Sequence, residues 1–196
     1  MVDLKLSTRK LNALQYACLQ NALRLHFDSV LLAKGRSFAS AFAISVIASE
    51  ELGKAFGMAE IIFQAGFDKG RLHAEDSKLV RALLSDHKLK QGWFVSSFFG
   101  ILDPKAKAVL RRYQDIQRAK NNAIYAGVRK GNHQIVRPFL ISASKAKQQI
   151  RTVNNALIDS VEGTLNGTYG YEDVADHVLR SRRLLNKLLR AAKTVR

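Results

Sequence analysis

The sequence predicts an all-α protein, an up-and-down helical bundle with additional C-terminal helices. Three observations predict it. Apolar residues recur at steps of three and four along most of the chain. Only 2 prolines and 12 glycines interrupt its 196 residues. The segments between the periodic stretches are short, which favours helices packed side by side. We expect a single domain over residues 1–196, with a core at about 8–131 and C-terminal helices at about 142–195.

The first two helices are predicted at about residues 8–34 and 37–65. Leu11, Leu14 and Cys18 share one face of the first helix, and Gly35 provides a stop. The second helix is mainly apolar and is expected to end before Gly66.

The next two helices are predicted at about residues 76–101 and from about 103 to 130. Leu83 and Phe94 lie on one stripe of the third helix. Asp103 followed by Pro104 is typical of a helix start, and Gly131 ends the fourth helix. A loop follows, to about residue 138.

The last two helices are predicted at about residues 142–165 and 171–194. Ile150, Val153 and Leu157 lie in register on the fifth helix. A glycine-containing turn over residues 166–170 separates it from the sixth. The sequence therefore predicts six helices and no strands.

The chain is strongly basic. It has 32 Lys and Arg against 16 Asp and Glu, a net charge of +16, but 47% of its residues are hydrophobic, which excludes a disordered basic tail. Eight basic residues lie between residues 105 and 130, and seven follow Asp176. Each patch alone is equally consistent with a solvated helix face, but two patches in one small domain favour a polyanionic partner.

Several classes of protein are excluded by what the sequence lacks. A lone Cys18 excludes a disulfide framework and a cysteine-rich zinc site. The chain has neither the Glu-x-x-His pairs of a di-iron bundle nor a phosphate-binding Gly-x-x-x-x-Gly-Lys loop. We therefore expect no metal and no cofactor. No apolar run reaches the ~18 residues of a membrane span, and no secretory signal is apparent, so we expect a cytoplasmic protein without a membrane partner.

Charged residues interrupt the apolar faces of the second helix. Glu50 and Lys54 fall on one apolar face, and Glu51 falls on the adjacent one. Burying these charges unpaired would cost several kcal/mol each. The i,i+4 spacing of Glu50 and Lys54 suits an ion pair that partly offsets this cost. The alternative is a surface ion pair where the helix emerges from the bundle.

The third and fourth helices show the same pattern. His87 and Lys90 fall on the inward stripe of the third helix, with Lys88 beside them. Lys120 lies in the apolar sector of the fourth helix. A polar cluster of Arg118, Asn122 and Tyr125 lies on another side of that helix, and Asn121 lies between this cluster and the apolar sector. Three successive helices with inward polar groups predict one polar cluster in the bundle.

Four segments form a recognisable combination: Asn21 with Asp28, residues 48–55 (ASEELGKA), residues 87–90 (HKLK) and residues 120–125 (KNNAIY). In this order, over about residues 12–128, they resemble the AbiV family of phage abortive-infection proteins in the HEPN superfamily of helical bundles. The resemblance implies a HEPN-like fold, antiphage function, host shutdown, and a homodimer with the polar site near its cleft. Many HEPN proteins are metal-independent endoribonucleases with an Arg-x(4–6)-His motif. Here Tyr125 stands where that histidine would fall, as is common in AbiV-like sequences.

Together the pattern and the resemblance predict one catalytic site made by Glu51, Lys54, His87, Lys120 and Tyr125. Histidine readily gives and takes a proton near neutral pH, so His87 is the expected acid or base in RNA cleavage. Lysines or Arg118 would hold the phosphate, Tyr125 or Asn121 would position it, and Glu51 would orient His87 or a lysine. The expected RNA-binding residues are Arg111, Arg112, Arg118, Asn121, Asn122, Lys88 and Lys90, with Asn21, Asp28 and Glu50 in supporting roles.

Two functions remain open on the sequence. The first is an endoribonuclease that shuts down translation, with RNA preferred over DNA because the reaction needs a 2′-OH. The second is a non-catalytic module that blocks translation by gripping RNA or an acidic protein. A phage-encoded or host protein is a further candidate partner.

Overall fold

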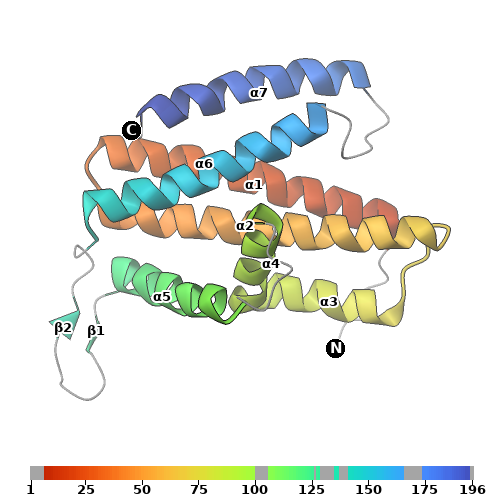
Figure 1. Ribbon diagram of the computed structural model, residues 1–196, viewed down its shortest axis with the longest axis horizontal. Helices are drawn as coiled ribbons and strands as arrows, with labels where there is room; N and C mark the ends of the chain where they lie inside the picture. Colours follow the sequence, from red (N-terminus) through yellow and green to blue (C-terminus); the bar gives the residue numbers. More distant parts are fainter. Residues whose placement is uncertain are drawn as a thin grey trace. The chain divides into compact units, whose positions relative to one another are not determined.

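The computed structural model describes residues 7–99, 106–125, 127–128, 135–136, 141–165 and 174–194. Its secondary structure confirms the all-α fold class (Figure 1). Within these residues the helices are α1 (Thr8–Lys34), α2 (Phe38–Phe67), α3 (Ala74–Ser85), α4 (His87–Phe99), α5 (Ala106–Ile124), α6 (Ala143–Leu165) and α7 (Val174–Thr194). Two strands, β1 (Gly127–Val128) and β2 (Ile135–Val136), pair in antiparallel fashion.

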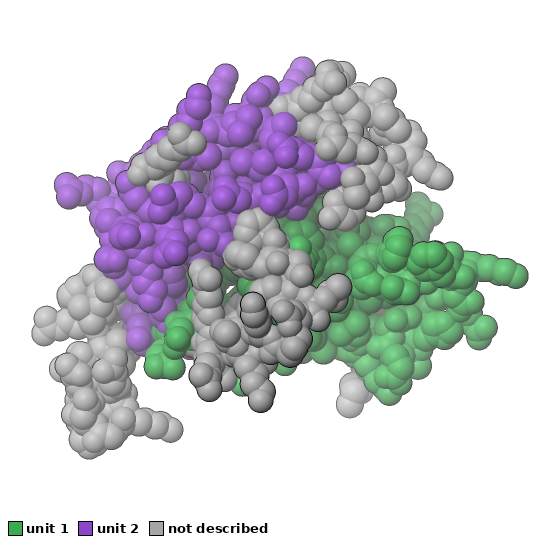
Figure 2. All heavy atoms as spheres, viewed as in Figure 1, with its two compact units in different colours: residues 1–24, 46–118 green, residues 25–45, 119–196 purple. Residues whose placement is uncertain are grey.

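The chain divides into two compact units (Figure 2). Unit 1 comprises residues 1–24 and 46–118, and unit 2 comprises residues 25–45 and 119–196. The helices α1, α2 and α5 each contribute residues to both units. The expectation of a single domain stays a prediction.

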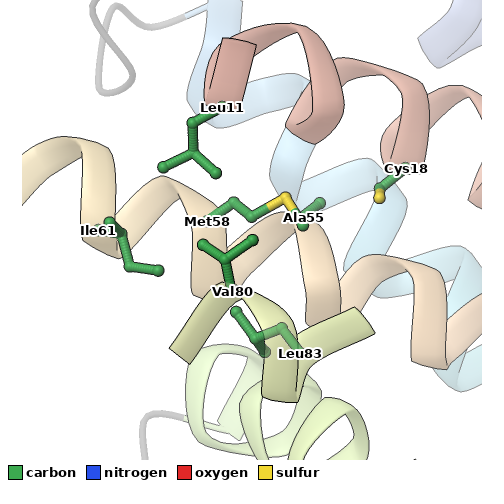
Figure 3. Close-up of a cluster of buried hydrophobic side chains, with 7 residues drawn as sticks. All are labelled: Leu11, Cys18, Ala55, Met58, Ile61, Val80 and Leu83. Carbon is green, nitrogen blue, oxygen red and sulfur yellow. The ribbon is translucent and has the colours of Figure 1, made fainter. Parts of the chain in front are cut away.

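The core of unit 1 is built by α1, α2 and α3 (Figure 3). Each helix turns its apolar stripe toward the other two, which is how an amphipathic helix buries its hydrophobic face. The cluster consists of Leu11, Cys18, Ala55, Met58, Ile61, Val80 and Leu83. This confirms the predicted inward face of the first helix.

The predicted third helix is wrong as a single element, because Asp86 divides it into α3 and α4. The backbone of Asp86 is extended, with φ −88° and ψ 110°. Its side-chain Oδ1 accepts hydrogen bonds from the N–H groups of Lys88 at 2.7 Å and Leu89 at 3.3 Å. Aspartate is among the best N-cap residues because its carboxylate satisfies donors that the first helical turn leaves free. The break resets the register of α4 relative to α3.

Two glycines let α2 lie very close to α3 and α4. A Cβ atom at Gly53 would overlap the carbonyl oxygen of Lys90, and one at Gly57 would lie 2.7 Å from Cδ1 of Leu83. Only a residue without a side chain fits at Gly53, where the overlap is with backbone, whereas a Cβ atom at Gly57 would require the Leu83 side chain to shift. The backbone contact between Gly53 and Lys90 fixes where α4 crosses α2.

The core of unit 2 combines the second part of α1 and the first part of α2 with α6 and α7. Val30, Ala41, Ile150 and Ala191 form a buried cluster, against which Phe27 packs. The apolar register predicted for residues 142–165 is confirmed, because Ile150 and Val153 are fully buried.

Other predicted boundaries also differ from the structure. The helix α2 continues through Gly66 to Phe67, two residues beyond the prediction. The helix α5 ends at Ile124 instead of about residue 130, and Gly127–Val128 forms a strand with Ile135–Val136. Glycine and a β-branched valine both disfavour a helix interior, which explains the early end.

The predicted helix start at Asp103–Pro104 and the predicted start at Tyr171 lie outside the described residues. Among the helices that the structure describes, none has the length and hydrophobicity to cross a membrane.

Candidate functional site

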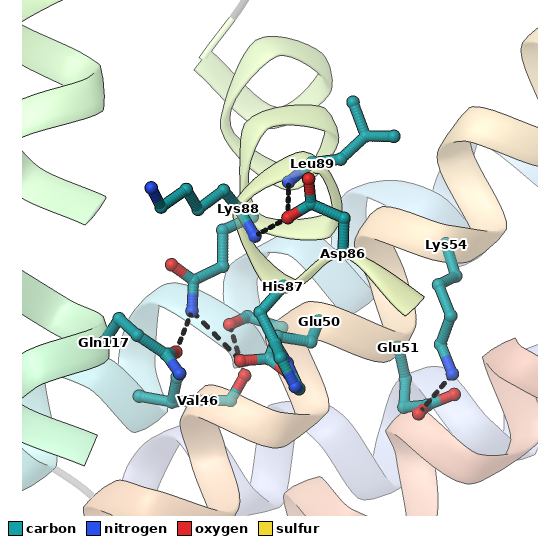
Figure 4. A network of polar contacts seen from close by, with 11 residues as sticks. Val46, Glu50, Glu51, Lys54, Asp86, His87, Lys88, Leu89 and Gln117 are labelled. Carbon is teal, nitrogen blue, oxygen red and sulfur yellow. Dashed lines mark hydrogen bonds and ion pairs between the residues drawn. The ribbon is translucent and has the colours of Figure 1, made fainter. Parts of the chain in front are cut away.

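A hydrogen-bonded histidine and glutamate join α4 to α2 in unit 1 (Figure 4). Glu50 lies on α2, and its side chain is only 4% exposed, whereas the side chain of His87 at the start of α4 is 54% exposed. The Nδ1 atom of His87 lies 2.7 Å from Oε2 of Glu50. A buried carboxylate thus holds a histidine whose ring reaches solvent.

Two glutamines extend this pair into a network. Gln91 is 2% exposed, and its Nε2 donates to Oε1 of Glu50 at 3.0 Å and to Oε1 of Gln117 on α5 at 3.1 Å. Both oxygens of the Glu50 carboxylate therefore have a partner. A fixed carboxylate in turn fixes the orientation of the His87 ring.

The backbone contact at Gly53 explains why these residues meet. Glu50 lies three residues before Gly53 on α2, and His87 lies three residues before Lys90 on α4. Because residues three and four apart share a helix face, closing the helices at Gly53 and Lys90 brings Glu50 to His87 and Gln91. The glycine inside the Glu-Glu-Leu-Gly-Lys run therefore has a direct role in building the site.

The geometry assigns the roles of the two ring nitrogens. A carboxylate accepts hydrogen bonds, so Nδ1 of His87 carries a proton and donates its N–H to Oε2 of Glu50. Nε2 then holds the lone pair of the neutral ring. A histidine held in this way can take a proton from a bound substrate through Nε2.

Glu51 and Lys54 form a second pair on another side of α2, drawn apart from Glu50 and His87 in Figure 4. Nζ of Lys54 lies 2.6 Å from Oε1 of Glu51, and each side chain is 14% exposed. The predicted Glu50–Lys54 pairing is therefore wrong: the i,i+3 partner is used, because Glu50 faces α4. The carboxylate at His87 is Glu50, to which the sequence assigned only a supporting role.

Cys18 lies close to the Glu51–Lys54 pair. Burial, together with the charge and hydrogen bond of Glu51, raises the pKa of its thiol to about 11, although the positive charge of Lys54 acts in the opposite direction. A thiol with so high a pKa is not a nucleophile near neutral pH.

The other predicted residues of unit 1 have varied environments. The prediction that His87 faces inward is wrong, because the helix break at Asp86 changes its direction. Lys90 is 6% exposed, which weighs against a direct contact with RNA, whereas Lys88 is exposed. Arg118 is exposed and pairs with Asp115 at 3.2 Å.

Three predicted residues of unit 1 remain: Asn21, Arg111 and Arg112. The half-buried Asn21 accepts a hydrogen bond from Nη2 of Arg24 at 3.0 Å. The side chains of Arg111 and Arg112 lie outside the described part of the chain.

The remaining predicted residues belong to unit 2. Lys120 is 5% exposed, which confirms its inward position, whereas Tyr125 is 64% exposed. Asn121 is exposed, and Asn122 and Asp28 are half-buried. The hypothesis that Lys120 and Tyr125 act together with His87 stays a prediction.

Unit 2 also contains a buried polar pair that the sequence analysis missed. Nε2 of His26 on α1 lies 2.8 Å from Oδ1 of Asn154 on α6, and His26 is completely buried. Burial lowers the pKa of His26 to about 4, although the hydrogen bond to Asn154 acts in the opposite direction. His26 is therefore neutral near pH 7.

A signal for Gln91 was present in the sequence, whereas none pointed to Gln117. Gln91 lies four residues after His87 and so shares its face of α4.

Among the described residues, no cluster of three or more His, Cys, Asp or Glu side chains could hold a metal ion.

Comparison with known proteins gave one match. The HEPN_AbiV family model, described as AbiV, matches residues 10–158, which is more than half of the chain. No curated protein and no solved structure matched. The matched span includes every residue of the Glu50–His87–Gln91–Gln117 network.

Proposed function

Because this chain belongs to the AbiV family, which implies abortive-infection defence against phage, we propose that it is a metal-independent endoribonuclease that shuts down translation. The observation that carries this proposal is the Glu50–His87 pair. It presents a solvent-exposed imidazole on a buried carboxylate. A general base must be held in a fixed orientation to take a proton from a substrate. Here His87 is the proposed base, and the buried carboxylate of Glu50 orients its ring.

The proposed reaction is attack of an RNA 2′-oxygen on the adjacent phosphorus. Nε2 of His87 takes the proton of the 2′-OH, the new P–O bond forms, and the bond to the 5′-oxygen breaks. The leaving 5′-oxygen receives a proton from solvent water or from a nearby lysine ammonium group. The products are a 2′,3′-cyclic phosphate and a free 5′-OH, and no metal takes part.

Cations near His87 would hold the phosphate. Lys88 is the next residue along α4 and is exposed, so it is a candidate for this role. Lys54 is already paired with Glu51 and is less available. Lys120 and Tyr125 remain proposed members of the catalytic set, and the homodimer and a phage or host protein partner remain predictions.

The test is incubation of the purified protein with RNA in EDTA, followed by gel analysis of the products. His87→Ala should reduce the cleavage rate by roughly 10²- to 10⁴-fold, the usual contribution of positioned proton transfer. Replacing the ribose by deoxyribose at the cleaved position should abolish cleavage. The product should carry a cyclic phosphate.

His73 provides a matched control. It is also a histidine paired with a carboxylate, at 2.8 Å from Asp68, but both side chains are more than half exposed. His73→Ala should leave the rate unchanged. Equal losses in both variants, or full activity of His87→Ala at wild-type melting temperature, would contradict the role of His87.

The second candidate is a module that binds RNA without cleaving it. The net charge of +16 and the exposed positions of Lys88 and Arg118 favour it. In that case RNA stays intact in the assay above, translation in a cell-free extract is still inhibited, and Lys88→Glu reduces the inhibition more than His87→Ala does.

A further inference from the structure

A groove in unit 2 runs between α1 and α7, where the C-terminal ends of these helices lie together. Its volume is about 400 Å³, within the range of small-molecule sites. The apolar part of its lining consists of Phe27, Val30 and Leu31 from α1 and Ala191 from α7. Val30 and Ala191 also belong to the buried core cluster of this unit, so the groove has a firm floor.

One wall of the groove exposes apolar surface to water. Leu31 is 64% exposed although it is a large aliphatic side chain. Covering it would release ordered water and gain about 25 cal/mol for each Å² removed from solvent. The groove therefore favours an apolar ligand part.

The groove is also cationic. Lys34, Lys187 and Arg190 line it and are exposed, and the described lining residues include no carboxylate. None of these three cations forms an ion pair among the described side chains. The nearby C-terminal ends of α1 and α7 contribute only about half a negative charge each, so the net potential stays positive. An anionic group is therefore attracted here.

The lining distinguishes between kinds of anion. Thr194 is the one neutral polar side chain among the described lining residues, and its hydroxyl donates to the carbonyl oxygen of Arg190 at 3.2 Å. A nucleobase or a sugar would give up hydrogen bonds to water and find few replacements. A hydrocarbon chain makes no hydrogen bonds to water, so it gives up none on entering such a lining.

We propose that this groove binds an amphiphilic anion, an unbranched acyl chain with one anionic head group. The chain lies along Phe27, Val30 and Leu31, and the head group lies among Lys34, Lys187 and Arg190. The site is separate from the Glu50–His87 pair, and binding here does not depend on ribonuclease activity.

The test is calorimetric titration of the full chain with dodecanoate below its micelle concentration. Dodecyltrimethylammonium has the same chain with a positive head group and should bind at least roughly tenfold more weakly. Leu31→Asp and Lys187→Glu should each weaken dodecanoate binding by roughly three- to fivefold, the upper range for a charge at an exposed position. Both residues are exposed, so both variants should keep the wild-type melting temperature.

Lys193→Glu is the matched control, because it makes the same charge change on α7 at a residue that does not line the groove. It should change binding less than twofold. Phosphatidylglycerol vesicles distinguish a free acyl anion from a membrane surface. Binding to the vesicles but not to dodecanoate would overturn the proposal, as would equal binding of both amphiphiles or equal losses in Lys187→Glu and Lys193→Glu.

Discussion

Two histidines of unit 1 contact a carboxylate, and the burial of that carboxylate distinguishes them. His73 and Asp68 are both more than half exposed, whereas the side chain of Glu50 at His87 is 4% exposed. Exposed ion pairs contribute about 0–1 kcal/mol because water and salt screen them. The buried Glu50 also holds Gln91, so its removal leaves a buried amide with one partner fewer.

Glu50→Ala should therefore lower the free energy of unfolding by roughly 1–3 kcal/mol, the cost of breaking buried hydrogen bonds. Asp68→Ala should change it by less than about 1 kcal/mol. Urea denaturation of the two variants measures both values. Similar effects of the two substitutions would show that the buried network contributes little to stability.

His26 makes stability depend on pH. Its pKa is lowered from 6.5 to about 4 in the folded protein. Between these values the unfolded chain binds a proton that the folded protein does not, so the free energy of unfolding falls as the pH is lowered from about 6.5 to 4. Below pH 4 the contribution levels off, at a total loss of up to roughly 3 kcal/mol.

The measurement is urea denaturation at several pH values for the wild type and for His26→Leu. Carboxylates titrate in the same range, so the difference between the two proteins isolates His26. His26→Leu should show a flatter pH dependence than the wild type between about pH 6.5 and 4. Parallel curves for the wild type and His26→Leu would show that His26 is not held neutral.

At the scale of elements, the glycines of α2 decide how closely other helices approach it. Gly53 faces the backbone of Lys90, whereas a Cβ atom at Gly66 would meet nothing within 4 Å. Both residues lie within the same helix. Comparing the same glycine-to-alanine substitution at the two positions therefore separates intrinsic helix preference from the effect of packing.

Gly53→Ala should destabilise the protein by roughly 1–3 kcal/mol or more, because the methyl group overlaps backbone that has no freedom to move aside. Gly66→Ala should stabilise it by roughly 0.5–1 kcal/mol through helix propensity. Thermal unfolding of both variants tests this. Gly53→Ala should also reduce RNA cleavage in the folded fraction, because it moves His87 away from Glu50. A Gly53→Ala variant with the stability of the wild type would contradict the close contact between Gly53 and Lys90.

At the scale of the whole molecule, charge governs the expected interaction with RNA. The protein carries a net charge of +16, and its basic residues concentrate between residues 105 and 130 and after residue 176. Such a charge attracts any polyanion, and binding releases the counterions condensed on the RNA. The salt dependence of binding therefore reports how many phosphates the protein contacts.

The logarithm of RNA affinity should fall linearly with the logarithm of salt concentration, with a slope of about −0.7 for each single-strand phosphate contacted. Reversing the charges of Arg111 and Arg112 should weaken binding and make the slope shallower without lowering the melting temperature. Fluorescence anisotropy at several salt concentrations measures both effects. Lys78→Glu, on α3 and outside the basic segments, is the control. Binding that does not depend on salt would indicate a protein partner instead.

The sequence by itself determined the helices and most of their ends. Helix periodicity is local, so Leu11 and Cys18 on one face, and Gly35 after Lys34, predict α1 without knowledge of the rest. It also predicted that Lys90 and Lys120 face inward, which their burial confirms, whereas a functional role of Glu50 and His87 stays a prediction. Asp86 had the right residue type for a cap, but the apolar stripe continued past it and concealed the break.

Only the tertiary structure decided which of these residues meet. His87 contacts Glu50 and not Glu51 because Gly53 fixes how α4 crosses α2, and neighbouring positions on a helix point about 100° apart. Gln117 reaches Gln91 from 26 residues away, and Asn154 reaches His26 from 128. The sequence pattern of one helix reports whether a side chain is buried, but its partner depends on which face of another helix packs against it.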